Sequence, residues 1–302
     1  MQQPIVVFGD LNLDTSVSIE QFPLDLGDTR FCFDGINDDI GGAATNVAVG
    51  LTALGHAVHF ASVIGNDHVA KVVLQIAQTK GLAMQYIRPD WQTTSRTVVL
   101  IDHAGNHQCI NDPKAVQRYH YPENVLPTIF AQSQWVYCST QNWCRYVAQA
   151  AYDAGKQVIV DVQALVNVDD YHRDFLQAAS IVILSTEQLA IHSHELMHVL
   201  WRAFDVEIVV ATHGNHGATL GVRSTNQIDY APAFNLGPVV DKTGAGDAFC
   251  AGFIAGLASD LTPQQALNVG QYVAASKIGV KGSTNGFPHY QQVLQALQKS
   301  TA

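Results

Sequence analysis

Residues Asp241–Phe249 read DKTGAGDAF, with small residues at 244–246 followed by an apolar run. The small residues let backbone amides converge, and the apolar run indicates a helix that begins at this point. A helix N-terminus carries unpaired N–H groups and a partial positive charge. The segment therefore predicts an anion site of the kind that binds phosphate.

Asp247 lies inside this predicted anion site, where its carboxylate would repel a bound phosphate. It is suited instead to act as a base that takes a proton from an attacking hydroxyl group. The amides around Gly244, Ala245 and Gly246 would then stabilise a transferring phosphoryl group. Taken alone, the segment leaves a second interpretation open, an aspartate that caps a helix after a tight glycine turn.

A second glycine-rich segment, Gly41–Ala48, reads GGAATNVA and continues to a glycine at position 55. The pair Gly41 and Gly42 before a helix permits close approach of the backbone to a ligand. Asn46, one turn into that helix, can present its amide to a hydroxyl group. Glycine pairs also precede helices for packing reasons, so this segment by itself predicts a binding site only weakly.

Short β-branched runs alternate with helix-length segments over most of the chain. The expected strands are Ile5–Phe8, Val58–Val63, Trp135–Tyr137, Val158–Val160, Ile181–Leu184 and Glu207–Ala211. The expected helices between them are Ala43–Leu54, Val69–Thr79, Trp143–Ala154 and Gln188–Ala203. Continuous apolar strands separated by helices predict an α/β fold with a parallel sheet covered on both faces. After the strand pair Ala218–Arg223 and Gln227–Tyr230, we expect three helices, Ala245–Ala258, Pro263–Ile278 and Tyr290–Gln298.

Two stretches, 13–40 and 86–110, alternate polar and apolar residues instead. Period-two alternation is typical of a half-exposed antiparallel sheet. Each stretch leaves the main body at the carboxyl end of an expected core strand, so we interpret both as a small lid over the ligand-binding edge. With no linker or repeat, residues 1–302 are expected to form a single domain with that lid.

The composition excludes several classes of protein. Of 302 residues, 47% are hydrophobic and 14% are charged, and the net charge is -10. This acidic balance argues against a partner that is a nucleic acid or an anionic membrane. Five scattered cysteines without a CxxC pair are typical of reduced thiols, and no apolar stretch is long enough to span a membrane. We therefore expect a cytoplasmic protein.

Together, the glycine-rich segments and two further ones resemble the signatures of the ribokinase-like (PfkB) carbohydrate kinase family, over nearly the whole chain. Val6–Asp14 is similar to the family's first strand, with Asn12 and Asp14 at its substrate-binding positions. The glycine pair with Asn46 matches the N-terminal signature, whose residues contact sugar hydroxyls. The resemblance thus implies a substrate site built from these residues.

The nucleotide site is implied by the other two segments. The TxGxxG turn formed by Thr212, Gly214 and Gly217 matches the turn that lies beside the nucleotide phosphates in the family. Gly244–Asp247 matches the anion hole of the C-terminal signature, in which Asp247 corresponds to the catalytic base. The order and spacing of all four segments agree with the family pattern.

The resemblance also implies the fold and the cofactors. The fold would be a three-layer α/β/α sandwich with a mostly parallel central sheet and a small β-sheet lid, and many relatives form homodimers through that lid. The reaction would use ATP and Mg²⁺. Asp241 and Thr243 occupy places where several relatives bind an activating monovalent cation such as K⁺.

Two positions depart from the family pattern. The usual N-x-x-E motif, which places Mg²⁺ through water, is replaced here by Ser185 and Gln188, and Glu187 offers a substitute carboxylate after a small rotation. Lys242 stands where relatives have a small polar residue. It would either add positive charge near the phosphates or point into solvent.

Three functions stay open at this point. The first is a sugar kinase of ribokinase or fructokinase type that phosphorylates a hydroxymethyl group. The second is a nucleoside kinase, because Cys109–Asp112 resembles a segment of pseudouridine kinases. The third is a binding or regulatory protein that keeps the fold without turnover.

His194–His198 satisfies the zinc-protease pattern HExxH, but no third ligand follows at a suitable spacing, so we interpret it as a helix surface.

Overall fold

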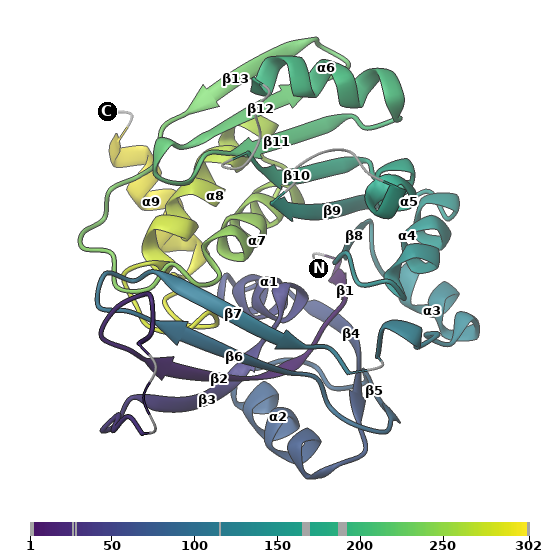
Figure 1. The fold of residues 1–302 in the computed structure, drawn as a ribbon. Helices are drawn as coiled ribbons and strands as arrows, with labels where there is room; N and C mark the ends of the chain where they lie inside the picture. Colours follow the sequence, from purple (N-terminus) through teal and green to yellow (C-terminus); the bar gives the residue numbers. More distant parts are fainter. Residues whose placement is uncertain are drawn as a thin grey trace.

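A computed structural model of the chain describes residues 3–25, 27, 29–114, 116–164, 170–186 and 192–300. Within these residues the main body is a nine-stranded sheet with the order β13-β12-β11-β10-β9-β8-β1-β4-β5 (Figure 1). In that order the strands are β13 (Gln227–Ala231), β12 (Ala218–Val222), β11 (Ile208–Thr212), β10 (Ile181–Ser185), β9 (Gln157–Ala164), β8 (Trp135–Cys138), β1 (Ile5–Phe8), β4 (Val58–Gly65) and β5 (Tyr86–Trp91). The strands from β11 to β5 are parallel, and β12 and β13 continue the sheet in antiparallel fashion.

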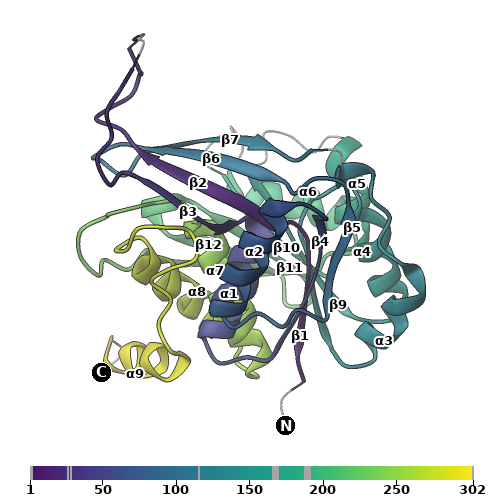
Figure 2. The same cartoon turned by 90° about the horizontal axis from the view of Figure 1, so that it is seen from below.

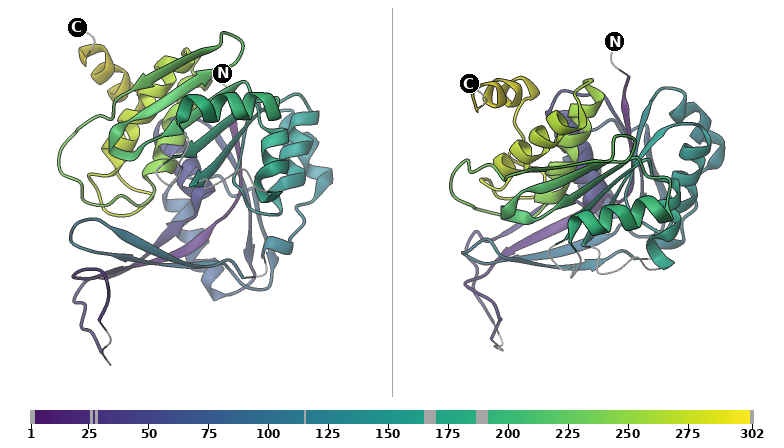
Figure 3. Two further views of the ribbon diagram at one scale, coloured as in Figure 1. Left: turned by 45° about the horizontal axis from the view of Figure 1, so that its top comes forward. Right: turned by 90° about the horizontal axis from the view of Figure 1, so that it is seen from above.

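Helices cover both faces of this sheet, as Figure 3 shows. One face carries α1 (Ala43–Ala53), α2 (His68–Thr79), α7 (Ala245–Ala258), α8 (Pro263–Lys277) and α9 (Tyr290–Ser300). The other carries α3 (Leu126–Phe130), α4 (Cys144–Asp153), α5 (Asp170–Ala178) and α6 (Ser193–Ala203). Single-turn 3₁₀ helices span Val116–Arg118, Glu123–Val125 and Gly214–His216.

The apolar strands divide their side chains between two cores. In β1, Ile5 and Val7 pack into the core under α1 and α7, whereas Val6 and Phe8 pack into the core under α3 and α4. A strand that is buried on both faces must be apolar at every position, which is why these runs lack alternation. The predicted three-layer α/β/α sandwich with a mostly parallel sheet is confirmed.

A second sheet of four strands lies beside the carboxyl edge of the first, in the order β3-β2-β6-β7. Its strands are β3 (Ile36–Gly41), β2 (Asn12–Ser18), β6 (Arg96–Ile101) and β7 (His107–Asp112). Figure 2 shows that the connection between β2 and β3 projects away from the body. We call these four strands the small sheet.

One expected boundary of this sheet requires correction. The stretch 86–110 is divided, because Tyr86–Trp91 forms β5 and pairs in parallel with β4 in the large sheet. The small sheet takes only Arg96 onward from this stretch. The half-buried edge strand of a parallel sheet alternates in the same way as a lid strand, so the period alone could not assign β5.

Helix boundaries follow from capping side chains. The Asp67 carboxylate accepts a hydrogen bond from the amide of Ala70 at 2.8 Å and begins α2. Thr262 and Gln265 form a reciprocal capping box at the start of α8.

Among the described helices, none combines the length and the apolar character that a membrane span requires.

Candidate active site

The two glycine-rich segments meet at the edge of the large sheet where the parallel strands end. The first turns of α1 and α7 lie side by side, and Asn46 Nδ2 donates a hydrogen bond to Asp247 Oδ2 at 2.7 Å. This bond joins positions that are 201 residues apart in the chain. The structure therefore places the predicted base beside the predicted substrate-binding amide.

The carboxyl group of Asp247 is set for proton transfer near neutral pH. Burial raises its pKa to about 7, and the nearby carboxylates of Asp161 and Asp10 act in the same direction. The hydrogen bond from Asn46 and the charge of Lys277 oppose that rise. A carboxylate with this pKa is a far stronger base than an ordinary aspartate, yet it is still half ionised at pH 7.

The loop before α7 presents backbone amides beside this carboxyl group. Gly244 has a left-handed conformation with φ 77° and ends the turn as the N-cap of α7. The amide of Ala245 donates to the Lys242 carbonyl at 3.1 Å and is engaged inside the turn. Within the described part of the chain, the amides of Gly246 and Asp247 have no hydrogen-bond partner. These two amides are therefore free to bind an anion.

The start of α1 is held by Asp10, a residue that the sequence analysis did not single out. Its Oδ2 accepts from the amide of Ala43 at 3.1 Å, and its Oδ1 accepts from the amide of Ala44 at 3.2 Å. Gly42 has φ 103°, and a Cβ there would lie 2.4 Å from Asp10 Oδ2. The glycine at this position thus makes room for the carboxylate that caps α1. An acidic residue just beyond the first strand was the only available signal.

Asp14 lies on β2 and points toward the glycine pair. Its Oδ1 is buried, and within the described residues it has no hydrogen-bond partner. A Cβ at Gly41 would lie 1.7 Å from its Oδ2, so a side chain at that position would displace the carboxylate. Burial raises the pKa of Asp14 to about 7, and Asp10 and Asp39 add to the rise while a hydrogen bond with Thr97 opposes it. A buried acceptor without a partner is suited to a ligand hydroxyl.

Asn12 belongs to the same group of polar side chains. It is buried, and its Nδ2 donates to Thr97 Oγ1 at 3.4 Å. Thr97 Oγ1 in turn donates to Asn111 Oδ1 at 3.4 Å on β7. Asp10, Asn12 and Asn111 line one small pocket between the two sheets. The structure thus brings all five predicted substrate residues to this junction.

The predicted nucleotide residues lie farther along the same sheet edge. Ser185 ends β10 and Thr212 ends β11, and the two are partners in the parallel register. Gly214 and Gly217 follow in the turn after β11, both with positive φ, and a Cβ at Gly217 would lie 2.1 Å from the carbonyl oxygen of Ala231. The two positions connected with Mg²⁺, Glu187 and Gln188, lie outside the described residues.

Two further side chains support this edge of the sheet. His213 bonds through Nδ1 to Thr186 Oγ1 at 2.6 Å and through Nε2 to Thr219 Oγ1 at 2.8 Å, which fixes the turn after β11. Asp161 lies within β9 next to Asp247, and burial raises its pKa to about 6. An aspartate inside the apolar run of β9 was the available signal for this residue.

Lys242, predicted beside the phosphates or in solvent, and the predicted cation residues Asp241 and Thr243 occupy different surroundings. Lys242 is exposed and donates to Asn106 Oδ1 at 3.4 Å, in the hairpin between β6 and β7. Asp241 Oδ1 accepts from the amide of Thr243 at 2.9 Å, inside the loop that leads to α7. Among the residues that the structure describes, no group of three or more His, Cys, Asp or Glu side chains could hold a metal ion.

Comparison with known proteins agrees with this geometry. Residues 2–289 match a family described as pfkB family carbohydrate kinase. The acarbose 7(IV)-phosphotransferase of Actinoplanes sp. is 27% identical over 254 residues, which cover 83% of this chain and 84% of that protein. The structure of a microbiome-derived acarbose kinase, Mak1, has a TM-score of 0.89 at 25% identity and covers 99% of this chain and 100% of its own. An Arabidopsis thaliana ribokinase complexed with ribose and ATP has a TM-score of 0.84 at 22% identity, with 99% of both chains covered.

Proposed function

The chain belongs to the PfkB family of carbohydrate kinases, and we propose that it transfers the γ-phosphoryl group of ATP to a hydroxymethyl group of a sugar. The single observation that supports this most strongly is the hydrogen bond of 2.7 Å between Asn46 and Asp247. It joins a residue suited to bind a sugar hydroxyl to a carboxyl group whose pKa is raised to about 7.

In the proposed reaction, the sugar hydroxyl oxygen attacks the γ-phosphorus of ATP. The bond between that phosphorus and the β,γ-bridging oxygen breaks, and ADP leaves with the bond's electron pair. The Asp247 carboxylate takes the hydroxyl proton. The free amides of Gly246 and Asp247 stabilise the charge on the transferring group, and most of the catalysis comes from position and electrostatics.

We assign the remaining site residues by their position. Asn12, Asp14 and Asn46 would hold sugar hydroxyls, since Asp14 Oδ1 and Asn46 Oδ1 are buried acceptors without partners among the described residues. ATP would enter as its Mg²⁺ complex along the ends of β10 and β11, beside Ser185 and Thr212. The small sheet would close over both substrates and exclude water.

The proposal is tested by ADP release from Mg-ATP with a panel of pentoses, hexoses, their phosphates, oligosaccharides and nucleosides. We expect one strong responder, and we expect Asp247→Asn to lower kcat by about 10²–10⁴-fold while Mg-ATP still raises the melting temperature. Wild-type turnover by this variant would contradict the assignment of the base. ATP binding without turnover of any acceptor would favour a regulatory homologue.

One observation keeps a nucleoside acceptor in that panel. Asn111, in the segment that resembles pseudouridine kinases, reaches the substrate group through Thr97 and lines the same pocket as Asn12. Its amide could hydrogen-bond a base edge. If a nucleoside is the strong responder, Asn111→Ala should raise the KM for the nucleoside and leave the KM for ATP unchanged.

We also propose a homodimer through the small sheet. All six residues of the edge strand β7 are exposed, so its backbone groups are available for pairing. Phe31 and Phe33, on the projecting connection, are 82% and 89% exposed, and their rings stack with centroids 6.1 Å apart. A second copy of the chain would cover both features.

A further inference from the structure

Lys277, the last residue of α8, is a lysine with no exposed surface. Its Nζ donates a hydrogen bond of 2.9 Å to the main-chain carbonyl oxygen of Asp241, which is itself fully buried. Asp241 begins the loop that leads to the anion site of α7. A buried ammonium group at such a point requires a compensating environment, because burial strongly disfavours an isolated charge.

The compensating charges are the carboxylates of Asp241 and Asp247. Burial lowers the pKa of Lys277, and both carboxylates oppose that fall. Asp241 is held as a carboxylate in spite of its burial, because hydrogen bonds from Thr243 and Gly282 and the charge of Lys277 lower its pKa. Lys277 therefore forms part of a fixed group of charges beside the loop that leads to α7.

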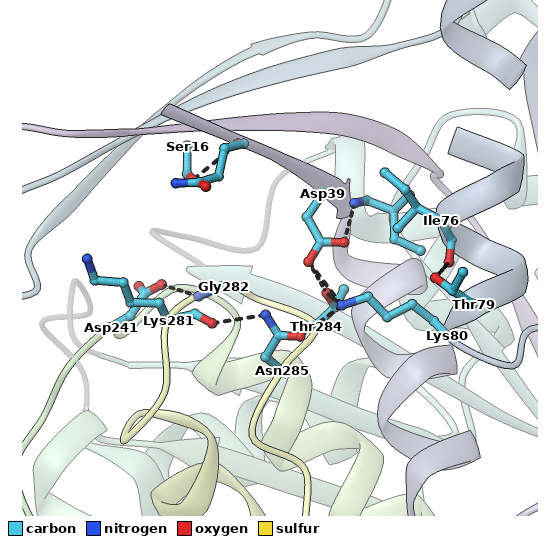
Figure 4. A network of polar contacts seen from close by, with 12 residues as sticks. Ser16, Asp39, Ile76, Thr79, Lys80, Asp241, Lys281, Gly282, Thr284 and Asn285 are labelled. Atoms are coloured by element: carbon cyan, nitrogen blue, oxygen red, sulfur yellow. Dashed lines mark hydrogen bonds and ion pairs between the residues drawn. The ribbon is translucent and has the colours of Figure 1, made fainter. Parts of the chain in front are cut away.

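The loop that follows α8 completes this arrangement. The amide of Gly282 donates to Asp241 Oδ2 at 2.8 Å, as Figure 4 shows. Two residues later, Thr284 Oγ1 donates to Asp39 Oδ2 at 2.9 Å, and Lys80 Nζ bonds to Asp39, Thr284 and Asn285 at 2.8–3.0 Å. These hydrogen bonds hold the loop against Asp241 and the small sheet.

A monovalent metal ion does not fit this environment. The family resemblance implies K⁺ bound by backbone oxygens at Asp241 and Thr243, but the carbonyl of Asp241 already accepts from an ammonium group. A second cation on that carbonyl would be repelled at short range in a medium of low dielectric constant. The residues present are therefore not suited to bind the monovalent cation that the resemblance implies.

We infer that the ammonium group of Lys277 takes the place of a monovalent cation. The positive charge beside the loop that leads to α7 is then part of the chain itself, and activity does not depend on K⁺. This inference rests on the proposed kinase function. The different possibility, a lysine with only a packing role, predicts no link between this side chain and dissolved cations.

The test begins with the wild-type protein in choline chloride and in KCl at equal ionic strength. We expect the same kcat/KM for the sugar in both. Lys277→Ala, which removes the ammonium group and leaves space, should lose about 10²-fold in kcat without K⁺, and K⁺ or ethylamine should restore at least about tenfold. Lys277→Met fills the same space, so it should lose activity without rescue. Lys71→Ala, on the exposed side of α2, controls for the change in net charge.

A second measurement does not require turnover. Crystals of wild type and of Lys277→Ala are soaked in Tl⁺, whose anomalous signal reports a bound monovalent ion. We expect a peak at the Asp241 carbonyl in the variant alone. Activation of the wild type by K⁺, a Tl⁺ peak there in the wild type, or a folded Lys277→Ala that neither K⁺ nor ethylamine rescues would overturn the inference. If no acceptor is phosphorylated at all, the proposed function fails, and the Tl⁺ soak still decides the role of Lys277.

Discussion

The hydrogen bond from Asn46 to Asp247 predicts a measurable change in the pH dependence of the reaction. The amide donates to the ionised carboxylate and therefore favours that form. Asn46→Ala removes the donor and should raise the pKa of Asp247 above its value of about 7. Because a base must be deprotonated to act, activity is present above this pKa and is lost as the pH falls through it.

The size of the shift follows from the strength of the bond. A hydrogen bond to a charged group contributes about 1.5 kcal/mol, and 1.36 kcal/mol corresponds to one pKa unit, so the pKa should rise by about one unit. At pH 7 about half of the wild-type base is ionised, whereas about a tenth would be ionised in Asn46→Ala. Titration alone should then cost about fivefold at pH 7 and almost nothing at pH 9 or above.

The assay is kcat/KM for the sugar between pH 5.5 and pH 9.5 at constant ionic strength, chosen as a range of about two units on each side of the expected midpoint. Asn12→Ala is the matched control, because Asn12 donates to Thr97 and not to Asp247. It should raise KM and leave the midpoint of the profile unchanged. A midpoint for Asn46→Ala that coincides with the wild-type midpoint would refute the role of this bond.

Three other perturbations have defined outcomes. Gly42→Ala should lower the free energy of unfolding by about 2 kcal/mol in urea titrations, because φ is 103° and the new Cβ would meet Asp10; an unchanged midpoint would show that the loop relaxes freely. Lys80→Met should lower the free energy of unfolding by about 1–2 kcal/mol, since its ion pair with Asp39 is only partly exposed. A similar loss in Lys71→Met, inside the helix α2 that Lys80 caps, would point to a general effect of removing a lysine here and not to the ion pair. The double variant Phe31→Ser with Phe33→Ser should shift the light-scattering mass from dimer to monomer, and a dimer of undiminished affinity would place the interface elsewhere.

The layers of the fold could be predicted from the sequence because burial on both faces leaves a direct trace. Ile5–Phe8 and Ile181–Leu184 are apolar and buried at consecutive positions, as a strand covered on both faces requires. The assignment of Tyr86–Trp91 could not be made in the same way. Alternation reports how much of a strand is exposed, but not which neighbour it pairs with.

The site was predictable where a residue type carries its own backbone or chemical signal. Gly42 and Asp247 belong to such segments, since glycine marks an unusual φ and an aspartate within an anion site implies a proton acceptor. Asp10 and Asp161 are marked only as acidic residues beside or within an apolar strand, which does not show their roles, and Lys277 carries no local mark. Their roles come from neighbours that the fold brings from distant positions, such as the carbonyl of Asp241 for Lys277.

A short connection between the two sheets divides the residues of the candidate site between them. Only Gly9, Asp10 and Leu11 lie between the end of β1 and the start of β2. Asn12 and Asp14 therefore belong to the small sheet, while Asp247 lies in α7, which packs on the large one. In the proposed closure, a sugar that contacts both sheets would hold them together, whereas a water molecule beside Asp247 is too small to do so. The division should make the enzyme select its acceptor by size and reach, and keep wasteful hydrolysis of ATP slow when no sugar is present.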